Sequence, residues 1–232
     1  MLHIFTLWYG RKYPVDNVNN LYKSLKKHYK KPFKFYCYTD KPKELGRGIK
    51  PIVLNRTIRP AIEGAWHKID FFQDNFVKYG KNDECICLDI DVEIIKDPSP
   101  IFDIKVAKGY IGSLDKWWTN SPCRIDGGFY KWIPNTMSYL SDKFYEDYTK
   151  WLFHYFDTKQ VTVLYAGEQN FVFEHAKGYV SAPGKYATRW QDDRATQLNR
   201  IYSETVGEFS ILRVDNKWVD SLALVHYSRY IG

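Results

Sequence analysis

Residues 84–95, ECICLDIDVEII, decide the fold class of this 232-residue chain. The apolar residues from Cys85 to Leu88 predict a buried strand. We expect this strand to cover all of residues 84–95. Two carboxylates, Asp89 and Asp91, follow on the same side of the chain at the carboxyl end of the apolar part. Because ligands in open α/β sheets bind at the carboxyl ends of strands, this end is the first candidate for a functional site.

The sequence on both sides of this run alternates between strand and helix patterns. Strand patterns lie at 2–9, 33–40, 52–54, 109–114, 129–132 and 222–228. Helical spacing of apolar residues covers 15–29, 62–76 (closed by Gly80), 135–156 and 167–176, and an irregular aromatic loop covers 115–128. The order predicts an α/β fold with a mixed, mostly parallel central sheet and helices on both faces. The length fits one domain, 1–232.

Net charge, the length of the apolar runs and the spacing of the cysteines indicate what kind of protein this is. Lys and Arg number 34 against 27 Asp and Glu, and the net charge of +7 favours anionic partners. No apolar run approaches the roughly 20 residues of a membrane span, and the start of the chain lacks the basic and apolar regions of a signal peptide. We therefore expect a cytoplasmic protein without a membrane span. The cysteines follow no zinc spacing and are expected to be reduced, buried thiols: Cys37, Cys85, Cys87 and Cys123.

The paired carboxylates Asp89 and Asp91 indicate a metal site. Two neighbouring carboxylates repel each other unless a proton or a cation lies between them, and Mg²⁺ and Mn²⁺ prefer oxygen ligands. A metal held there could bridge to a diphosphate. The alternative is a strand end with two solvated aspartates.

Two further readings of the chain stay open at this point. Asp89 to Val92 also fits the D-x-D-x-T/V motif of haloacid-dehalogenase-like phosphatases, in which Asp89 would be the nucleophile. That motif normally ends the first strand of its fold, whereas here other strand patterns precede it. A non-catalytic module that binds glycans or nucleic acid would explain the charge and the aromatic content of 18%, but not the paired carboxylates.

Several motifs together resemble one family. RIDGGFY (124–130), GEQN (167–170) and LVHY (224–227) accompany the D-x-D pair in a pattern similar to GT-A fold nucleotide-sugar glycosyltransferases. The chain resembles the retaining group that includes glycogenin and lipopolysaccharide galactosyltransferases, over 2–176 and the C-terminal histidine. TLWYGRKY (6–13) is similar to the family's T-x-x-x-N-x-x-Y turn, with Gly10 in place of Asn. RPAIEGAWHK (59–68) is similar to its R-P…K segment.

The resemblance implies a role for each matching residue. A divalent metal, Mn²⁺ or Mg²⁺, would bind to Asp89, Asp91 and His226. The nucleotide would contact Thr6, Leu7, Tyr9 and Tyr13, and the diphosphate would lie near Asp89, Arg59, Lys68 and Arg229. Arg229 would stand in for a family lysine, which is missing after the histidine here. The reaction centre would contain Lys68, Asp126, Glu168 and Gln169.

The reaction implied by the resemblance is the transfer of a hexose to a hydroxyl acceptor, such as a glycan, with retention of configuration. A UDP-sugar is the favoured donor, and nucleic acid is not an expected partner. Residues 1–92 would form the nucleotide-binding half and 93–232 the acceptor half. An aromatic tract could form a platform for the acceptor sugar or pack in the core: Trp117, Trp118, Phe129, Tyr130 and Trp132.

Overall fold

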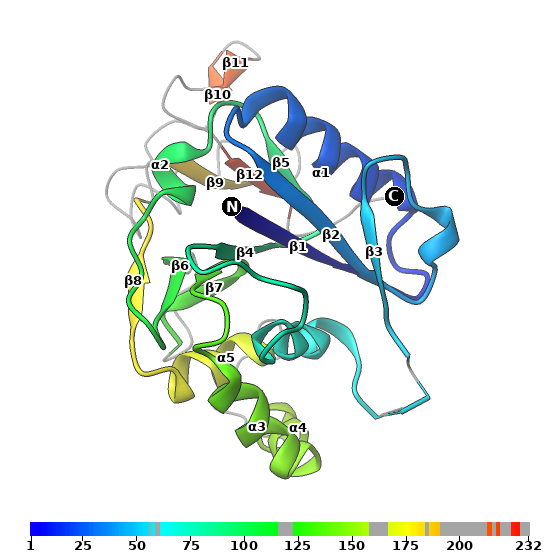
Figure 1. Cartoon of the computed structure of the whole chain (residues 1–232), viewed down its shortest axis with the longest axis vertical. Coiled ribbons are helices and arrows are strands. Elements are labelled where there is room, and N and C mark those ends of the chain that lie inside the picture. Colours follow the sequence, from blue (N-terminus) through cyan, green and yellow to red (C-terminus); the bar gives the residue numbers. More distant parts are fainter. Residues whose placement is uncertain are drawn as a thin grey trace.

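A seven-stranded mixed sheet forms the centre of the computed structural model (Figure 1). The structure describes residues 1–55, 57–58, 61–115, 123–157, 167–183, 186–190, 213–214, 217–218 and 224–227. At 115, 156–157 and from 188 onward, only the backbone is described. The strands of this sheet lie in the order β3-β2-β1-β4-β7-β6-β8. Their bounds are β1 Leu2–Trp8, β2 Phe33–Thr39, β3 Lys50–Val53, β4 Glu84–Leu88, β6 Ile111–Asp115, β7 Ile125–Trp132 and β8 Tyr179–Ser181.

The strand directions confirm a mixed, mostly parallel sheet. Strands β3, β2, β1 and β4 run parallel to one another, and β6 runs parallel to β8. Strand β7, between β4 and β6, is antiparallel to both. A second sheet has the order β5-β12-β9, with β5 Val92–Ile94, β9 Ala187–Trp190 and β12 Leu224–Tyr227. β12 is antiparallel to β5 and parallel to β9. A short hairpin pairs β10 (Arg213–Val214) with β11 (Lys217–Trp218).

Helices cover both faces of the central sheet, as the sequence predicts (Figure 1). Helix α1 (Val15–His28) and the short α2 (Ser99–Phe102) pack on one face. The 3₁₀ helix η2 (Gly64–Phe72) and helices α3 (Ser138–Glu146), α4 (Tyr148–Asp157) and α5 (Glu168–His175) lie on the other. A further 3₁₀ turn, η1 (Pro42–Glu44), precedes β3.

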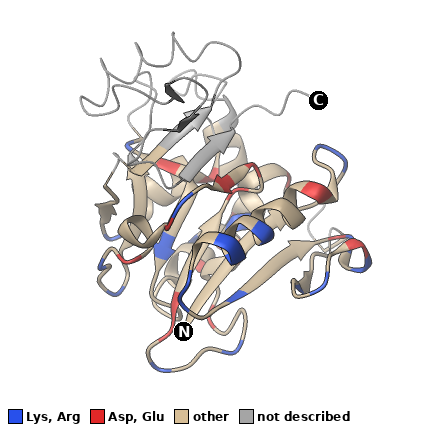
Figure 2. Cartoon of the chain, turned by 90° about the horizontal axis from the view of Figure 1, so that it is seen from above, with Lys and Arg blue, Asp and Glu red and all other residues tan. Residues whose placement is uncertain are grey.

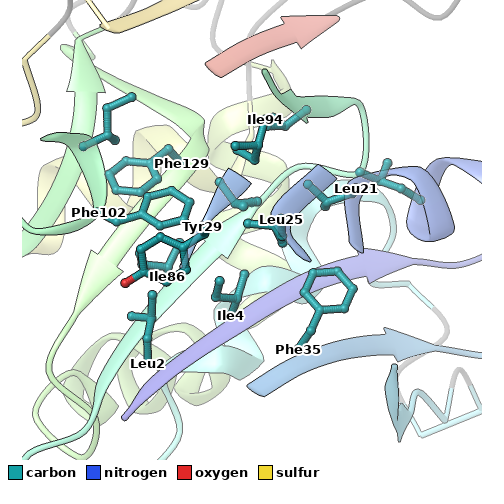
Figure 3. Packing of buried hydrophobic residues seen from close by; sticks show 14 of the residues in the cluster. Leu2, Ile4, Leu21, Leu25, Tyr29, Phe35, Ile86, Ile94, Phe102 and Phe129 are labelled. Atoms are coloured by element: carbon teal, nitrogen blue, oxygen red, sulfur yellow. The ribbon is translucent and has the colours of Figure 1, made fainter. Parts of the chain in front are cut away.

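Each face of the sheet has its own apolar core. On the α1 face, Leu25 and Tyr29 pack towards Ile4 and Ile86, in the centres of β1 and β4 (Figure 3). Phe102 stacks on Phe129 with an interplanar angle of 4°. The opposite face is built largely from rings, and its core holds more aromatic residues than the core on the α1 face.

The run 84–95 does not form the single strand that its pattern predicts. β4 ends at Leu88, the chain turns through Asp89 and Asp91, and β5 begins at Val92 in the second sheet. The turn is closed by a hydrogen bond from the Val92 amide to the Asp89 carbonyl, 3.2 Å long. The apolar pattern continues through the turn because both strands are buried, so periodicity alone cannot place the break.

Three other predicted boundaries are also wrong. The helix predicted over 62–76 is the 3₁₀ helix η2, which begins at Gly64 and ends at Phe72, before Gly80. The helix predicted over 135–156 is divided at Asp147, whose carboxylate accepts a hydrogen bond from the Lys150 amide and so caps α4. The loop predicted up to residue 128 ends earlier, because β7 already begins at Ile125.

The surface and the thiols agree with the expectations from composition. Cys37, Cys85, Cys87 and Cys123 are free and buried. Basic and acidic residues are interspersed over the described ribbon (Figure 2), and α1 carries exposed lysines in its last two turns. Among the described residues, none of the helices has the length and apolar character needed to cross a membrane.

Candidate functional site

A cavity of about 360 Å³ opens where β1 and β4 end, next to the turn that holds Asp89 and Asp91. This volume lies within the usual range for small-molecule sites. The segment that follows β1 forms one wall and the start of η2 forms another. The lining residues are Leu7, Trp8, Tyr9, Gly10, Arg11, Lys12, Tyr13, Glu63, Gly64, Ala65, Lys68, Asp89, Ile90 and Asp91.

The backbone holds the two carboxylates of the turn in place. The Asp89 amide donates to the carbonyl of Gly128 in β7, over 3.0 Å, so the start of β7 fixes the position of the turn. Asp91 is buried, and its Oδ2 accepts a hydrogen bond of 3.1 Å from the Tyr13 hydroxyl. Burial and the charge of Asp91 raise the pKa of Tyr13, which therefore stays protonated as a donor.

Lys68 brings the carboxylates of two distant segments together. Its buried Nζ forms an ion pair with Oδ1 of Asp89 and lies 3.3 Å from Oε1 of Glu168. It also donates a 2.8 Å hydrogen bond to the carbonyl of Gly127. Burial by itself would lower the pKa of Lys68, but the charges of Asp89 and Glu168 hold it well above its ordinary value. Lys68 is therefore a fixed positive charge in the wall of the cavity.

Gly127, at the start of β7, lies against this cluster. Its amide donates to Oε1 of Gln169 over 3.1 Å, and the Tyr130 hydroxyl donates to Oε1 of Glu168 over 3.4 Å. A Cβ atom at Gly127 would lie 2.8 Å from Oε1 of Glu168 and 3.1 Å from Oε1 of Gln169. A side chain at this position would displace both, so glycine is required for this close approach.

The structure thus brings together most of the described residues that the sequence predicts for the site. Leu7, Tyr9, Tyr13, Lys68, Asp89 and Asp91 line the cavity, and Glu168 and Gln169 contact Lys68 and Gly127 behind it. Tyr9 also lies close to the start of η2, where its hydroxyl accepts from the Gly64 amide.

Two predicted residues lie deeper than expected. Thr6 is fully buried in β1 and does not line the cavity, which is reached only by Leu7 and Trp8 at the end of the strand. Asp126 is also buried, and its Oδ1 accepts from the amide of Gly128 over 3.1 Å. In the described structure, Asp126 therefore shapes the start of β7, where it fixes the Gly127–Gly128 segment.

The pairing of β12 places His226 beside the turn. The Cα register pairs His226 with Val92, the residue directly after Asp91. The His226 side chain lies outside the described residues, as do Arg59 and Arg229. The backbone register brings β12 next to the turn, and the roles of His226 and of the two arginines remain predictions.

Of the two alternatives for the aromatic tract, core packing is correct for the part that the structure describes. Phe129, Tyr130 and Trp132 are at most 1% exposed and pack in the two cores, so they cannot present an open face to a sugar. The core alternative holds because β7 is buried along its whole length. Trp117 and Trp118 lie outside the described residues.

Three contacts were not predicted from the sequence: the Gly127 carbonyl on Lys68, the Tyr130 hydroxyl on Glu168, and Glu63 in the cavity wall. The paired glycines of RIDGG were a usable signal for the contact between Gly127 and Lys68, since glycine in a strand often marks a place where another group comes close to the backbone. Nothing in the local pattern signals the other two.

This sheet, with the D-x-D turn at the end of β4, has the GT-A fold of nucleotide-sugar glycosyltransferases. Solved structures with the same fold bear this out. An active-site mutant of LgtC superposes with a TM-score of 0.63 at 13% identity, covering 97% of this chain and 86% of LgtC. The galactosyltransferase LgtC in complex with donor and acceptor sugar analogs gives a TM-score of 0.61 at 11% identity, with the same coverage.

Two other glycosyltransferases are also similar in structure. GlyE from Streptococcus pneumoniae TIGR4 gives a TM-score of 0.60 at 15% identity, over 98% of this chain and 55% of GlyE. Mouse xyloside xylosyltransferase 1 gives 0.53 at 11% identity, over 97% of both chains. No protein-family model matches the sequence, and no curated protein matches it. At these identities, the likeness establishes the fold.

Proposed function

We propose that this chain is a glycosyltransferase that moves a hexose from a nucleotide diphosphate sugar, with UDP-sugars favoured, to a hydroxyl acceptor. The observation that carries the proposal is the position of Lys68, whose buried ammonium contacts Asp89 of the D-x-D turn and Glu168 of α5 at the wall of the cavity. The structural neighbours with this fold are glycosyltransferases, which supports the same conclusion.

The donor set fits a divalent metal. Asp89 and Asp91 offer carboxylate oxygens, and the β12 register brings the backbone of His226 next to Val92. Carboxylate and imidazole ligands together suit Mn²⁺ and also accommodate Mg²⁺. When bound, the metal would supply Lewis-acid charge for the departing diphosphate. Arg59 and Arg229 are proposed to add positive charge to the same group.

The chain's own residues have distinct roles in the proposal. Leu7, Tyr9 and Tyr13 line the part of the cavity assigned to the base and ribose. Lys68 holds Asp89 and Glu168 at fixed positions and keeps a positive charge next to the diphosphate. Gln169, held by the Gly127 amide, is the proposed polar group at the sugar, in keeping with retention of configuration.

The two halves of the chain divide these tasks. In this proposal, residues 1–92 provide the nucleotide side of the cavity, and residues 93–232 provide Glu168, Gln169 and most of the acceptor side. The phosphatase alternative is less consistent with the fold, because the D-x-D strand β4 follows three other strands of the sheet. No contact in the described structure favours the non-catalytic module.

The test is a thermal-shift panel of UDP, GDP and CDP with and without Mn²⁺, followed by an assay of UDP-sugar hydrolysis. We expect Mn²⁺-dependent stabilisation by one nucleotide, and its loss together with hydrolysis in Asp91→Asn. Asp74→Asn, which changes an exposed aspartate outside the cavity, is the matched control and should behave as the parent chain. Release of phosphate from a phosphomonoester, without nucleotide preference, would instead identify a phosphatase.

A further inference from the structure

A second cavity, of about 480 Å³, lies beside the first one. It is formed between the segment that leads into η2 and the outer side of α4. Glu63 lines both cavities, and Gly167, at the edge of the second, directly precedes Glu168 of the Lys68 cluster. A ligand in the second cavity would therefore lie next to the proposed reaction centre.

The lining of this second cavity is mainly apolar. Trp66, Leu152, Phe153 and Tyr155 provide rings and an aliphatic side chain, and Glu63 and Thr149 are the polar side chains among the described lining residues. Few polar side chains among the described lining residues could hydrogen-bond to a sugar ring, whereas an alkyl or aryl group would remove apolar area from water against these rings. The chemistry of the described lining suits a hydrocarbon or aromatic group better than a sugar.

Phe153 is one of the most exposed large apolar side chains in the described part of the chain. It is 68% exposed, although it borders the apolar cavity directly. A bound apolar group would remove part of this ring from water, which is favourable in proportion to the area buried.

Two other rings of the lining, those of Trp66 and Tyr155, are held in place by their neighbours. Trp66 stacks on Phe144 with ring centroids 5.2 Å apart and planes 10° apart, and it also contacts Tyr155. The Tyr155 hydroxyl donates to Oε2 of Glu174 in α5 over 2.5 Å. Since these rings are held by the core, the cavity exists before a ligand binds, and little ordering of side chains is needed.

We infer that the second cavity binds the apolar aglycone of the acceptor, an alkyl or aryl group attached to the sugar that receives the hexose. This inference rests on the proposed function and defines the chemical class of its acceptor. The acceptor sugar would lie between the two cavities, near Glu63, with its aglycone between Trp66 and Phe153.

The test measures binding directly, because this readout does not depend on turnover. Hexyl β-D-glucopyranoside and methyl β-D-glucopyranoside are titrated calorimetrically into the full chain with UDP and Mn²⁺ present. We expect the hexyl glycoside to bind at least about tenfold more tightly, since burial of several methylene groups contributes that much. In Phe153→Ser, the ratio of the two affinities should fall towards one.

Two further variants separate this result from a loss of folding. Thr149→Trp fills the cavity from an exposed helical position and should also abolish the preference for the hexyl glycoside. Val53→Ser changes a side chain that is 66% exposed, on edge strand β3 and outside both cavities, and should leave the preference unchanged. Equal affinities in the parent chain would overturn the inference, as would a hexyl preference that survives both Phe153→Ser and Thr149→Trp. Failure of the proposed function would appear separately, as absent hydrolysis of UDP-sugars.

Discussion

The ammonium of Lys68 lies 3.3 Å from Oε1 of Glu168, and both side chains are buried. Lys68 comes from η2 and Glu168 from the first turn of α5, and the same ammonium also forms an ion pair with Asp89 in the turn after β4. One lysine therefore joins three elements that are far apart in the sequence. Its charge neutralises carboxylates that would otherwise repel each other.

Replacement of this lysine should destabilise the fold and remove activity. We expect Lys68→Met to cost about 3–5 kcal/mol of the free energy of unfolding, because Glu168 would remain buried without its counter-charge. Chemical denaturation measures the loss. The double variant with Glu168→Gln should recover part of that stability but not UDP-sugar hydrolysis. Full additivity of the two single changes would contradict a direct interaction between these side chains.

A methyl group at Gly127 should disturb the site without a change of charge. In Gly127→Ala, the new Cβ would lie 2.8 Å from Oε1 of Glu168, so the carboxylate or the start of β7 must move. We expect a loss of about 1–3 kcal/mol in stability, the usual range for overpacking, and a fall in kcat of the transfer reaction. Differential scanning calorimetry and a UDP-sugar assay measure the two effects.

Gly167→Ala is the matched control for the stability measurement. Gly167 has an extended φ of 170°, and a Cβ there would meet no atom of the described residues within 4 Å. The free energy of unfolding of the Gly167→Ala variant should stay within about 0.5 kcal/mol of the parent value. An equal loss in both glycine variants would show that the Gly127 contact with Glu168 has no special role.

Stability should fall as the solution becomes mildly acidic, through His3 at the opposite end of the sheet. His3 is fully buried in β1 and its Nε2 lies 2.8 Å from Oδ2 of Asp83. Burial lowers the pKa of His3 below 6.5, although Asp83 acts in the other direction. The unfolded chain therefore binds a proton at a higher pH than the folded chain, so the free energy of unfolding decreases as the pH falls through about 6.5.

His3→Gln isolates this effect. Glutamine can still donate a hydrogen bond to Asp83 but does not titrate, so the decrease in stability between pH 7 and 5 should become shallower. The pH dependence of stability that remains in His3→Gln comes from other groups, such as His28 and His175. Burial also lowers the pKa of each of these histidines. Identical slopes in the parent chain and in His3→Gln would rule out a contribution from His3.

The carboxylate of Asp70 should be important for the position of η2. It is 5% exposed and accepts hydrogen bonds from the hydroxyl of Tyr38 in β2, over 2.9 Å, and from the hydroxyl of Tyr145 in α3. Asp70→Asn should cost about 1–3 kcal/mol, because the amide nitrogen cannot accept from either hydroxyl. Urea denaturation of Asp70→Asn, Tyr145→Phe and the double variant tests whether the two changes are coupled. Asp74→Asn, on the surface nearby, should have no measurable effect.

The sequence alone was sufficient for the fold class and for the first strands and helix of the chain. The alternation of apolar runs is local, so it predicts β1, α1, β2 and the mixed sheet with helices on both faces. The pair Asp89 and Asp91 was predicted as a candidate site, since two neighbouring carboxylates repel each other unless a proton or a cation lies between them. The local pattern also suggested roles for Lys68 and Glu168 by resemblance, but not their contact.

Tertiary structure decided where the predicted strand 84–95 breaks, because β5 pairs with β12 in a second sheet and a local pattern does not record its pairing partner. It decided that Tyr130 and Trp132 belong to the core, since β7 is covered on both faces. It also placed Lys68 between Asp89 and Glu168. Such a contact depends on how η2, β4 and α5 pack together, and periodicity carries no information about distances between segments that lie far apart in the chain.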